Sequence, residues 1–359
     1  MQCFRLLTLL LMLVLVACGT PATSNAPMGA TTQTQAAAPA QPSGAAEATA
    51  PACATDCTAY RVGMVQLVTH PAMDAAAKGV RDAFAASGLN VIIDAKNAQN
   101  DPAALTSILD GFRDAKVDLV VAVGTPPAQQ AFKTLQGTGI PIVFNTVTNP
   151  YAAGFATSET EHPGITGAQA LPPVTAAFDM IFKFKADAQK VGIVWTSSEK
   201  NSEYATGLAR DYAKSKGIEF IERQVTRTDE VLGAAESLAA EKVDAIFIST
   251  DSMVVSALEA VVKVANENDI GLFCNDPGSA ARGCVTAVGV DYYDNGFLSA
   301  KEMGVSILQG TKPDDIPIKK PEKQVIAVNT AAAQEQGLTI PAEVQQMATQ
   351  VLDKITPRQ

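Results

Sequence analysis

Short apolar runs alternate with stretches of helical periodicity along the chain from Tyr60 onward. Apolar runs of strand length that are separated by helical patterns predict βαβ units, in which parallel strands form a sheet with helices on both faces. The runs that we expect to be strands are Val62–Leu67, Val91–Asp94, Leu119–Val123, Ile142–Phe144, Val191–Thr196, Phe220–Val225, Ala245–Ser249 and Leu272–Asn275. This pattern predicts an α/β fold.

Two of the expected helices have well-marked starts. Asp101-Pro102 and Thr125-Pro126 each place a polar side chain before a proline. The polar side chain can cap the helix, and a proline at the first helical position loses only an N–H that has no partner within the helix.

The pattern repeats within the chain. Lys116-Val117-Asp118 and Lys242-Val243-Asp244 each precede a predicted strand, and the next strands lie in the similar segments 140–145 and 270–275. A chain of 359 residues is long enough for two domains. Two similar Rossmann-like lobes are therefore expected, whether they arose by duplication or whether two α/β halves converged on one pattern.

Charge and motifs exclude several classes of protein. The formal net charge is −10 and the acidic residues are scattered, so no basic stripe is available for nucleic acid. The chain has no G-x-G-x-x-G after a strand, no P-loop and no G-x-S-x-G, so we do not expect an enzyme. With His70 and His162 as its only histidines, it is also not expected to bind a metal ion.

The N-terminus has the features of an export signal. Residues 1–17 combine Arg5 with an apolar run that is too short to span a bilayer. The run ends in Leu15-Val16-Ala17-Cys18, which resembles the lipobox of bacterial lipoproteins, so Cys18 is the expected lipidation site. The alternative is an ordinary secretory signal followed by an incidental cysteine. Residues 18–59 have almost no large apolar side chain, and we expect them to be a disordered Ala/Pro/Thr-rich tether.

Four further cysteines follow Cys18, namely Cys53, Cys57, Cys274 and Cys284. An even number in an exported chain favours disulfides. Proximity in the sequence favours Cys53–Cys57 and Cys274–Cys284, although four cysteines allow three pairings.

The loops that follow the predicted strands are rich in Thr, Ser, Asn and Asp. Ligands of open parallel sheets bind outside the carboxyl ends of the strands, where loops and helix N-termini present backbone N–H groups. Two lobes that face each other would make a cleft of these ends.

Several of these loops carry a family resemblance. The stretches that carry it are Gln66-Leu67-Val68-Thr69-His70-Pro71-Ala72-Met73-Asp74, Asn97-Ala98-Gln99-Asn100-Asp101-Pro102, Pro141-Ile142-Val143-Phe144, Val147-Thr148-Asn149-Pro150, Ser197-Ser198-Glu199-Lys200-Asn201-Ser202, Val243-Asp244-Ala245-Ile246 and Asp291-Tyr292-Tyr293. From Tyr60 to about the C-terminus, the chain resembles the substrate-binding proteins of ABC transporters, in particular the TrpX-type receptors for tryptophan and tyrosine. It departs from the family pattern at Asn149, where Asp is usual, at Ser252, where Asn is usual, and at Pro127, a second proline in its loop.

The resemblance implies a type I periplasmic-binding-protein fold, with two doubly wound lobes joined by three crossing strands. It places the crossings near Pro163–Thr166, Val288–Asp291 and Pro317–Val325. Lobe 1 would then comprise residues 60–165 and 291–317, and lobe 2 residues 166–290 and 322–359.

The implied function is that of an extracytoplasmic, lipid-anchored, monomeric receptor without a cofactor. It would capture a small molecule, of which a hydrophobic or aromatic amino acid is the expected kind, and deliver it to an ABC permease and its ATPase. A sensory protein of the same fold that signals to a membrane receptor is the alternative, since both use closure around a ligand.

The cleft loops supply candidate ligand-binding residues. Thr125, Ser197, Ser198 and the free N–H groups near Ala128 could bind a carboxylate, although Thr125 could instead be only a helix cap. Asp251, Asp276 and Asp291 could each bind an ammonium group, or could each form a turn or a helix cap. The further candidates are Gln66, His70, Thr148, Asn201 and Thr250. Trp195, Phe144, Tyr292 and Tyr293 could form an aromatic wall or belong to the core.

Overall fold

The computed structural model describes residues 59–321 and 323–357. The expected signal peptide, Cys18, most of the tether, and Cys53 and Cys57 lie outside the described residues. Within the described part of the chain, no helix is both long enough and apolar enough to cross a bilayer.

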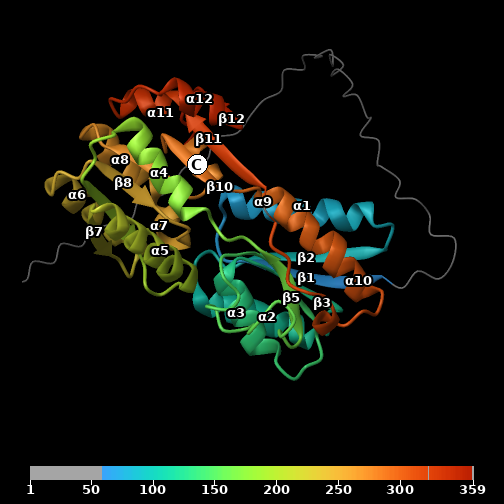
Figure 1. The fold of residues 1–359 in the computed structure, drawn as a ribbon. Coiled ribbons are helices and arrows are strands. Elements are labelled where there is room, and N and C mark those ends of the chain that lie inside the picture. The colour runs from blue at the N-terminus through green and yellow to red at the C-terminus, as the bar shows by residue number, and fades with distance from the viewer. Residues whose placement is uncertain (1–58, 322, 358–359) are drawn as a thin grey trace, which may run out of the picture. The chain divides into compact units, whose positions relative to one another are not determined.

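The first half of the chain forms a five-stranded parallel sheet in the order β2-β1-β3-β4-β5 (Figure 1). Every strand predicted here is present. The strands are β1 (Tyr60–Gln66), β2 (Val91–Asn97), β3 (Leu119–Val123), β4 (Ile142–Val147) and β5 (Ile165–Gln169).

Helices cover both faces of this sheet because its central strands are apolar on both sides. Leu119, Val121 and Val123 of β3 pack in one cluster with α1, whereas Val120 and Ala122 pack in another with α2 and α3. The first face is covered by α1 (Pro71–Ala86), α9 (Tyr292–Leu298), a π-helical turn (Ser299–Gly304) and α10 (Val305–Leu308), and the second by α2 (Pro102–Asp114) and α3 (Thr125–Leu135).

The second sheet has seven strands in the order β12-β11-β10-β9-β8-β6-β7. Its pairs are parallel except β10 with β11, and all four strands predicted here are present. The strands are β6 (Lys190–Trp195), β7 (Glu219–Gln224), β8 (Ala245–Ile248), β9 (Gly271–Cys274), β10 (Thr286–Val290), β11 (Gln324–Asn329) and β12 (Gln350–Leu352).

This sheet also has an apolar cluster on each face. Ala245 and Phe247 of β8 pack on one side and Ile246 and Ile248 on the other. The first cluster includes α4 (Val174–Phe184), α5 (Lys200–Lys216) and α12 (Ala342–Met347), and the second α6 (Val231–Ala240), α7 (Ser252–Ser256) and α8 (Leu258–Glu267). The remaining helices are α11 (Thr330–Glu335) and the 3₁₀ turns Thr228–Glu230, Pro277–Arg282 and Pro313–Asp315.

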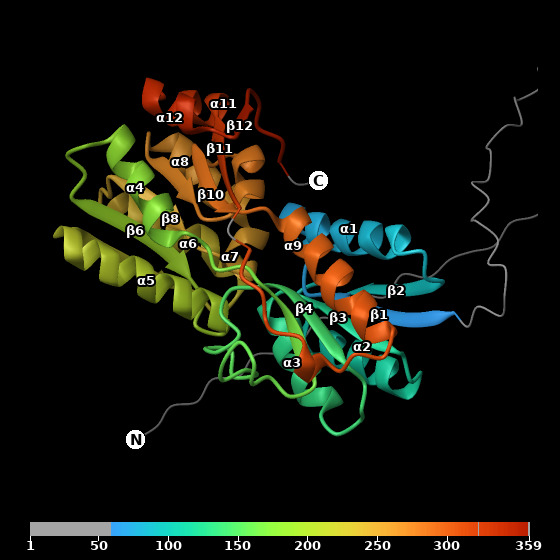
Figure 2. The ribbon, with the colours of Figure 1, turned by 45° about the vertical axis from the view of Figure 1, so that its right-hand side comes forward.

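We call each sheet with its helices a lobe, and the chain passes between the lobes three times (Figure 2). β5 pairs with β4 as far as its last residue, Gln169, so the first sheet continues beyond the expected boundary at residue 165. The chain returns to lobe 1 after β10, and Lys319 lies beside β5 in the last passage, where its carbonyl accepts the N–H of Gln169 at 2.8 Å. The fold is therefore of the type I periplasmic-binding-protein class.

Two local predictions had different outcomes. Asp101 caps α2, because its carboxylate accepts the N–H groups of Ala103 and Ala104. The prediction that Thr125 caps α3 is wrong: α3 begins at Thr125 itself, after Gly124, and no side chain caps it. Gly124 has a φ of 99°, a conformation that glycine adopts without steric cost.

Cys274 and Cys284 form a disulfide, with their Cα atoms 6.1 Å apart. The bond joins the end of β9 to the residue two before β10, and the 3₁₀ turn Pro277–Arg282 lies inside the loop that it closes. It thus braces a loop at the carboxyl edge of the second sheet.

Candidate functional site

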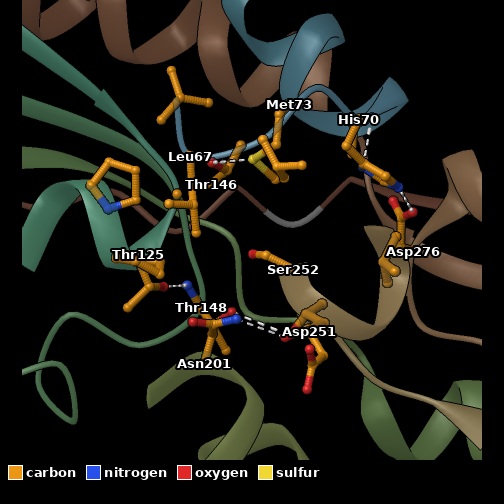
Figure 3. A pocket seen from close by; sticks show the side chains of 18 of the residues that line it. Leu67, His70, Met73, Thr125, Thr146, Thr148, Asn201, Asp251, Ser252 and Asp276 are labelled. Atoms are coloured by element: carbon orange, nitrogen blue, oxygen red, sulfur yellow. Dashed lines mark hydrogen bonds and ion pairs between the residues drawn. The ribbon is translucent and has the colours of Figure 1, made fainter. Parts of the chain in front are cut away.

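A pocket lies between the carboxyl ends of the two sheets (Figure 3). Its empty volume is about 580 Å³, the opening to solvent included, which is within the range of small-molecule sites. Seven of the twelve predicted ligand-binding residues line it: His70, Thr125, Thr148, Asn201, Thr250, Asp251 and Asp276. They come together because parallel strands of both lobes end here.

The two lobes touch across this pocket. His70 of lobe 1 and Asp276 of lobe 2 are both buried, with Nε2 of the ring 3.2 Å from Oδ2 of the carboxylate. Beside them, the hydroxyls of Thr148 and Thr250 are 3.4 Å apart. The described structure therefore has its lobes in contact around the pocket.

His70 is fixed by a second contact. It is the N-cap of α1, and its Nδ1 accepts the N–H of Ala72 at 3.2 Å. Since Nδ1 accepts, the ring hydrogen is on Nε2, which faces Asp276. Burial alone would raise the pKa of Asp276, but the His70 ring, with hydrogen bonds from Ser279 and Gly278, outweighs burial and holds that pKa below its usual value.

All three predicted ammonium partners are helix caps. Asp251 accepts the N–H of Val254 at 2.8 Å and caps α7, and Asp291 accepts that of Asp294 at 3.1 Å and caps α9. Asp276 caps the 3₁₀ turn at Pro277–Arg282. The capping alternative thus describes all three, and the short polar side chain that suits the end of a strand also suits the start of a helix.

A pair of buried carboxylates lies on the lobe 2 side. Asp251 Oδ2 accepts the Thr196 N–H and the Ser202 hydroxyl, at 2.7 and 2.6 Å. Burial, followed by the negative charge of Glu199, raises the pKa of Asp251 to about 7. Glu199 accepts the N–H groups of Ser252 and Met253 at the start of α7. Sequence reasoning did not select Glu199, although it lies within one of the stretches that resemble the family.

Asn201 connects this carboxylate pair to the pocket. Its Nδ2 donates to Glu199 Oε2 at 2.9 Å and to the Thr250 carbonyl at 2.8 Å. Its Oδ1 is buried and has no hydrogen-bond partner in the described chain.

On the lobe 1 side the pocket wall contains an irregular strand end. The pairing of β4 with β5 shifts register between Phe144 and Val147, and Thr146 has a φ of 55°. A β-branched residue in this region is strained, so its conformation requires support from neighbours. Asn295 of α9 supplies it, since its Oδ1 accepts the Thr146 N–H at 2.8 Å and its Nδ2 donates to the Gln169 carbonyl at 3.0 Å. Thr146 lies in a loop after a predicted strand but was not selected as a candidate, and nothing in the sequence pattern indicated Asn295.

Five predicted residues lie outside this pocket. The Gln66 amide donates to Val68 and Asp74, Ala128 is buried in the lobe 1 core, and Asp291 is paired with Lys323 at 2.9 Å. Ser197 accepts from Gln224, and Ser198 contacts Thr196 at 2.9 Å and lines a larger neighbouring cavity.

Of the candidate aromatic residues, only Tyr292 lines the pocket. Phe144 belongs to the lobe 1 core, Trp195 packs against a lobe 2 cluster, and Tyr293 stacks on Phe297 with its hydroxyl 2.8 Å from Asp82. Other apolar lining comes from Leu67, Val68, Met73, Val255 and the two prolines of α3. No lysine or arginine lines the pocket among the described residues, and no group of three or more His, Cys, Asp or Glu there could hold a metal ion.

Comparison with known proteins agrees with this architecture. The family model described as ABC transporter substrate binding protein matches residues 61–352. A tyrosine-binding protein of Clostridioides difficile is 34% identical over 274 residues, which cover 75% of this chain and 78% of that protein.

Solved structures show the same relationship. The ABC domain from Streptococcus pneumonia in complex with L-Trp has a TM-score of 0.78 and 26% identity, covering 82% of this chain and 100% of that chain. The ligand-free, open structure of a substrate-binding protein from Clostridium difficile, with adhesive properties, has a TM-score of 0.62 and 30% identity, covering the same shares. The relatives are solute-binding proteins and not enzymes, and this chain belongs to the ABC transporter substrate-binding protein family.

Proposed function

We propose that this protein is the extracytoplasmic receptor of an ABC importer and that its cargo is a hydrophobic or aromatic L-amino acid. The cargo would occupy the pocket between the lobes and be delivered to a permease driven by an ATPase. Lipidation at Cys18 would hold the receptor at the membrane as a monomer, with residues 18–59 as the tether.

The observation that carries the choice of cargo is the lining of the pocket. It combines an apolar wall that includes Met73, Val255 and Tyr292 with buried carboxylates and without a lysine or arginine among the described residues. Such a lining favours a ligand with an ammonium group and an apolar side chain over a phosphate or a carboxylate-rich solute. The relatives named for tyrosine and L-Trp support the same choice.

Contacts between the lobes suggest how cargo is retained. His70 with Asp276, and Thr148 with Thr250, join the lobes across the pocket. These contacts hold the two lobes together around the pocket, so we propose that the receptor opens and closes about its three interlobe passages.

A thermal-shift panel tests the cargo, with L-tyrosine, L-tryptophan, L-phenylalanine and L-leucine beside sugars, nucleosides and acidic amino acids. A ligand at a hundred times its Kd stabilises the folded state by about 2.7 kcal/mol. Calorimetry on each hit should give one-to-one binding. If no amino acid binds at millimolar concentration while a sugar or nucleoside does, the proposed cargo is wrong.

A further inference from the structure

The orientation of the Asn201 amide is determined by its neighbours. Both acceptors within reach of Nδ2, the Glu199 carboxylate and the Thr250 carbonyl, require a donor. A flipped amide would place its oxygen against these two acceptors, which is repulsive. The amide nitrogen therefore faces Glu199 and Thr250, and Oδ1 is the polar atom that remains for a ligand.

This remaining oxygen is buried and unpaired. Asn201 is 7% exposed and lines the pocket, yet Oδ1 has no partner in the described chain. Leaving a buried acceptor without a hydrogen bond is unfavourable, and native proteins rarely do so without a reason. A ligand that donates a hydrogen bond would remove the penalty.

We propose that Asn201 Oδ1 accepts a hydrogen bond from the ammonium group of the cargo. The proposal rests on the proposed function and assigns within it the ammonium-binding role that the sequence pattern predicted for one of Asp251, Asp276 and Asp291. Those carboxylates cap helices, whereas the Asn201 oxygen has no hydrogen-bond partner among the described residues.

Electrostatics favours an ammonium over a neutral donor. The hydrogen bond from Nδ2 to the Glu199 carboxylate polarises the amide and increases the negative charge on Oδ1. Asp251, next to Thr250, adds a second buried carboxylate to the same wall. Glu199 itself accepts the N–H groups of Ser252 and Met253, so it contributes charge while Asn201 supplies the contact.

The proposal is tested by changing the protein and the ligand together. Wild type and Asn201→Ala are each titrated by calorimetry with L-tryptophan and with indole-3-propionate, which lacks only the ammonium group. We expect wild type to bind tryptophan about 10- to 100-fold more tightly than the analogue, because hydrogen bonds to charged groups are of that strength. In the variant this preference should fall at least several-fold, with analogue affinity nearly unchanged.

The pair of ligands separates the contact from the general field of the pocket. The remaining carboxylates still disfavour the anionic analogue in Asn201→Ala, so only the part of the preference due to Asn201 should disappear. Asn268→Ala is a matched control. The Asn268 side chain does not line the pocket, and its amide donates to the Val264 carbonyl. This control should leave the affinity for both ligands unchanged.

Three outcomes distinguish the possibilities. Equal weakening of both ligands in Asn201→Ala would show that Asn201 only supports the fold, and would overturn the inference. Equal affinity of wild type for both ligands would overturn it even if the variant did not fold. L-Tyrosine and 3-(4-hydroxyphenyl)propionate repeat the test if tryptophan does not bind, and failure of every amino acid to bind wild type would reject the proposed cargo itself.

Discussion

Replacing Gly296 with alanine should destabilise the protein because Gly296 lies at a close contact between helices α1 and α9 of lobe 1. Helices α1 and α9 lie side by side in Figures 1 and 2, and their glycines face the opposite backbone. A Cβ on Gly296 would clash with the Ala76 carbonyl oxygen and lie 2.7 Å from its carbon. A Cβ on Gly79 would lie 2.8 Å from the Phe297 nitrogen. Because the obstacles are backbone atoms, no side-chain rotation can remove the clash.

The size of the effect follows from two opposing terms. Separating well-packed elements to admit a methyl group costs about 3 kcal/mol, the upper end of the usual range, since whole helices must move. Replacing glycine with alanine inside a helix returns about 1 kcal/mol. The free energy of unfolding should therefore fall by about 2 kcal/mol, which lowers the Tm of a folded unit of about 300 residues by about 3 °C.

Cargo affinity should fall as well, because Asn295 is the neighbour of Gly296 in α9. Its side chain accepts the Thr146 N–H and thereby supports the strained end of β4 that lines the pocket. Moving α9 away from α1 would move this support.

Urea unfolding followed by circular dichroism measures the stability, and calorimetry measures the affinity. Gly111→Ala is the matched control, since Gly111 is inside α2 and a Cβ there meets nothing within 4 Å. It should raise the free energy of unfolding by about 0.5 to 1 kcal/mol. If Gly296→Ala were as stable as wild type, or changed stability in the same direction as Gly111→Ala, the packing argument would be refuted.

Three further predictions concern charge and attachment. Asp276→Asn should weaken cargo binding, because it removes the charged partner of His70. The pKa of Asp276 is lowered in the folded state, so the stability that this carboxylate contributes is present above about pH 4 and is lost as the pH falls through the folded pKa. When unfolding is measured against pH, the stabilities of the variant and wild type should therefore converge in acid. Asp251 has the opposite sign: burial and the charge of Glu199 raise its pKa from 3.8 to about 7 on folding, so the stability that it contributes is present at low pH and is lost as the pH rises between those values. Asp251→Asn should flatten that slope when unfolding is measured against pH, and an unchanged slope would contradict the raised pKa. Cys18→Ala should be released from the membrane fraction, and a variant still bound after a salt wash would contradict lipidation there.

The main strands could be predicted from the sequence because their apolar runs are continuous and are bounded by turn residues. The same rule located much of the pocket, since Thr125, Thr148, Thr250 and Asp276 all lie close after strands. Chain order is enough for such predictions when strands are parallel.

Other features depend on contacts that chain order does not contain. The support of Thr146 by Asn295 joins residues 149 positions apart, and the shift in β4 pairing has no signature in composition. The role of each aspartate was also open, since a carboxylate after a strand can cap a helix or bind a ligand. For Asn201, the orphaned oxygen becomes evident only when Glu199 and the Thr250 carbonyl are placed beside the amide nitrogen.

The three interlobe passages also determine the order in which the molecule can be completed. Val80 and Phe84 of α1 are buried in a cluster that includes Met303 and Ile307, which are made only after β6 to β10. Because the chain is synthesised from its N-terminus, this apolar surface of α1 stays uncovered while most of lobe 2 is being made. Truncation after β10 would likewise remove α9 from lobe 1 and β11 from lobe 2. Such a fragment would contain two unfinished lobes rather than one complete domain, so the receptor should mature as a single cooperative unit.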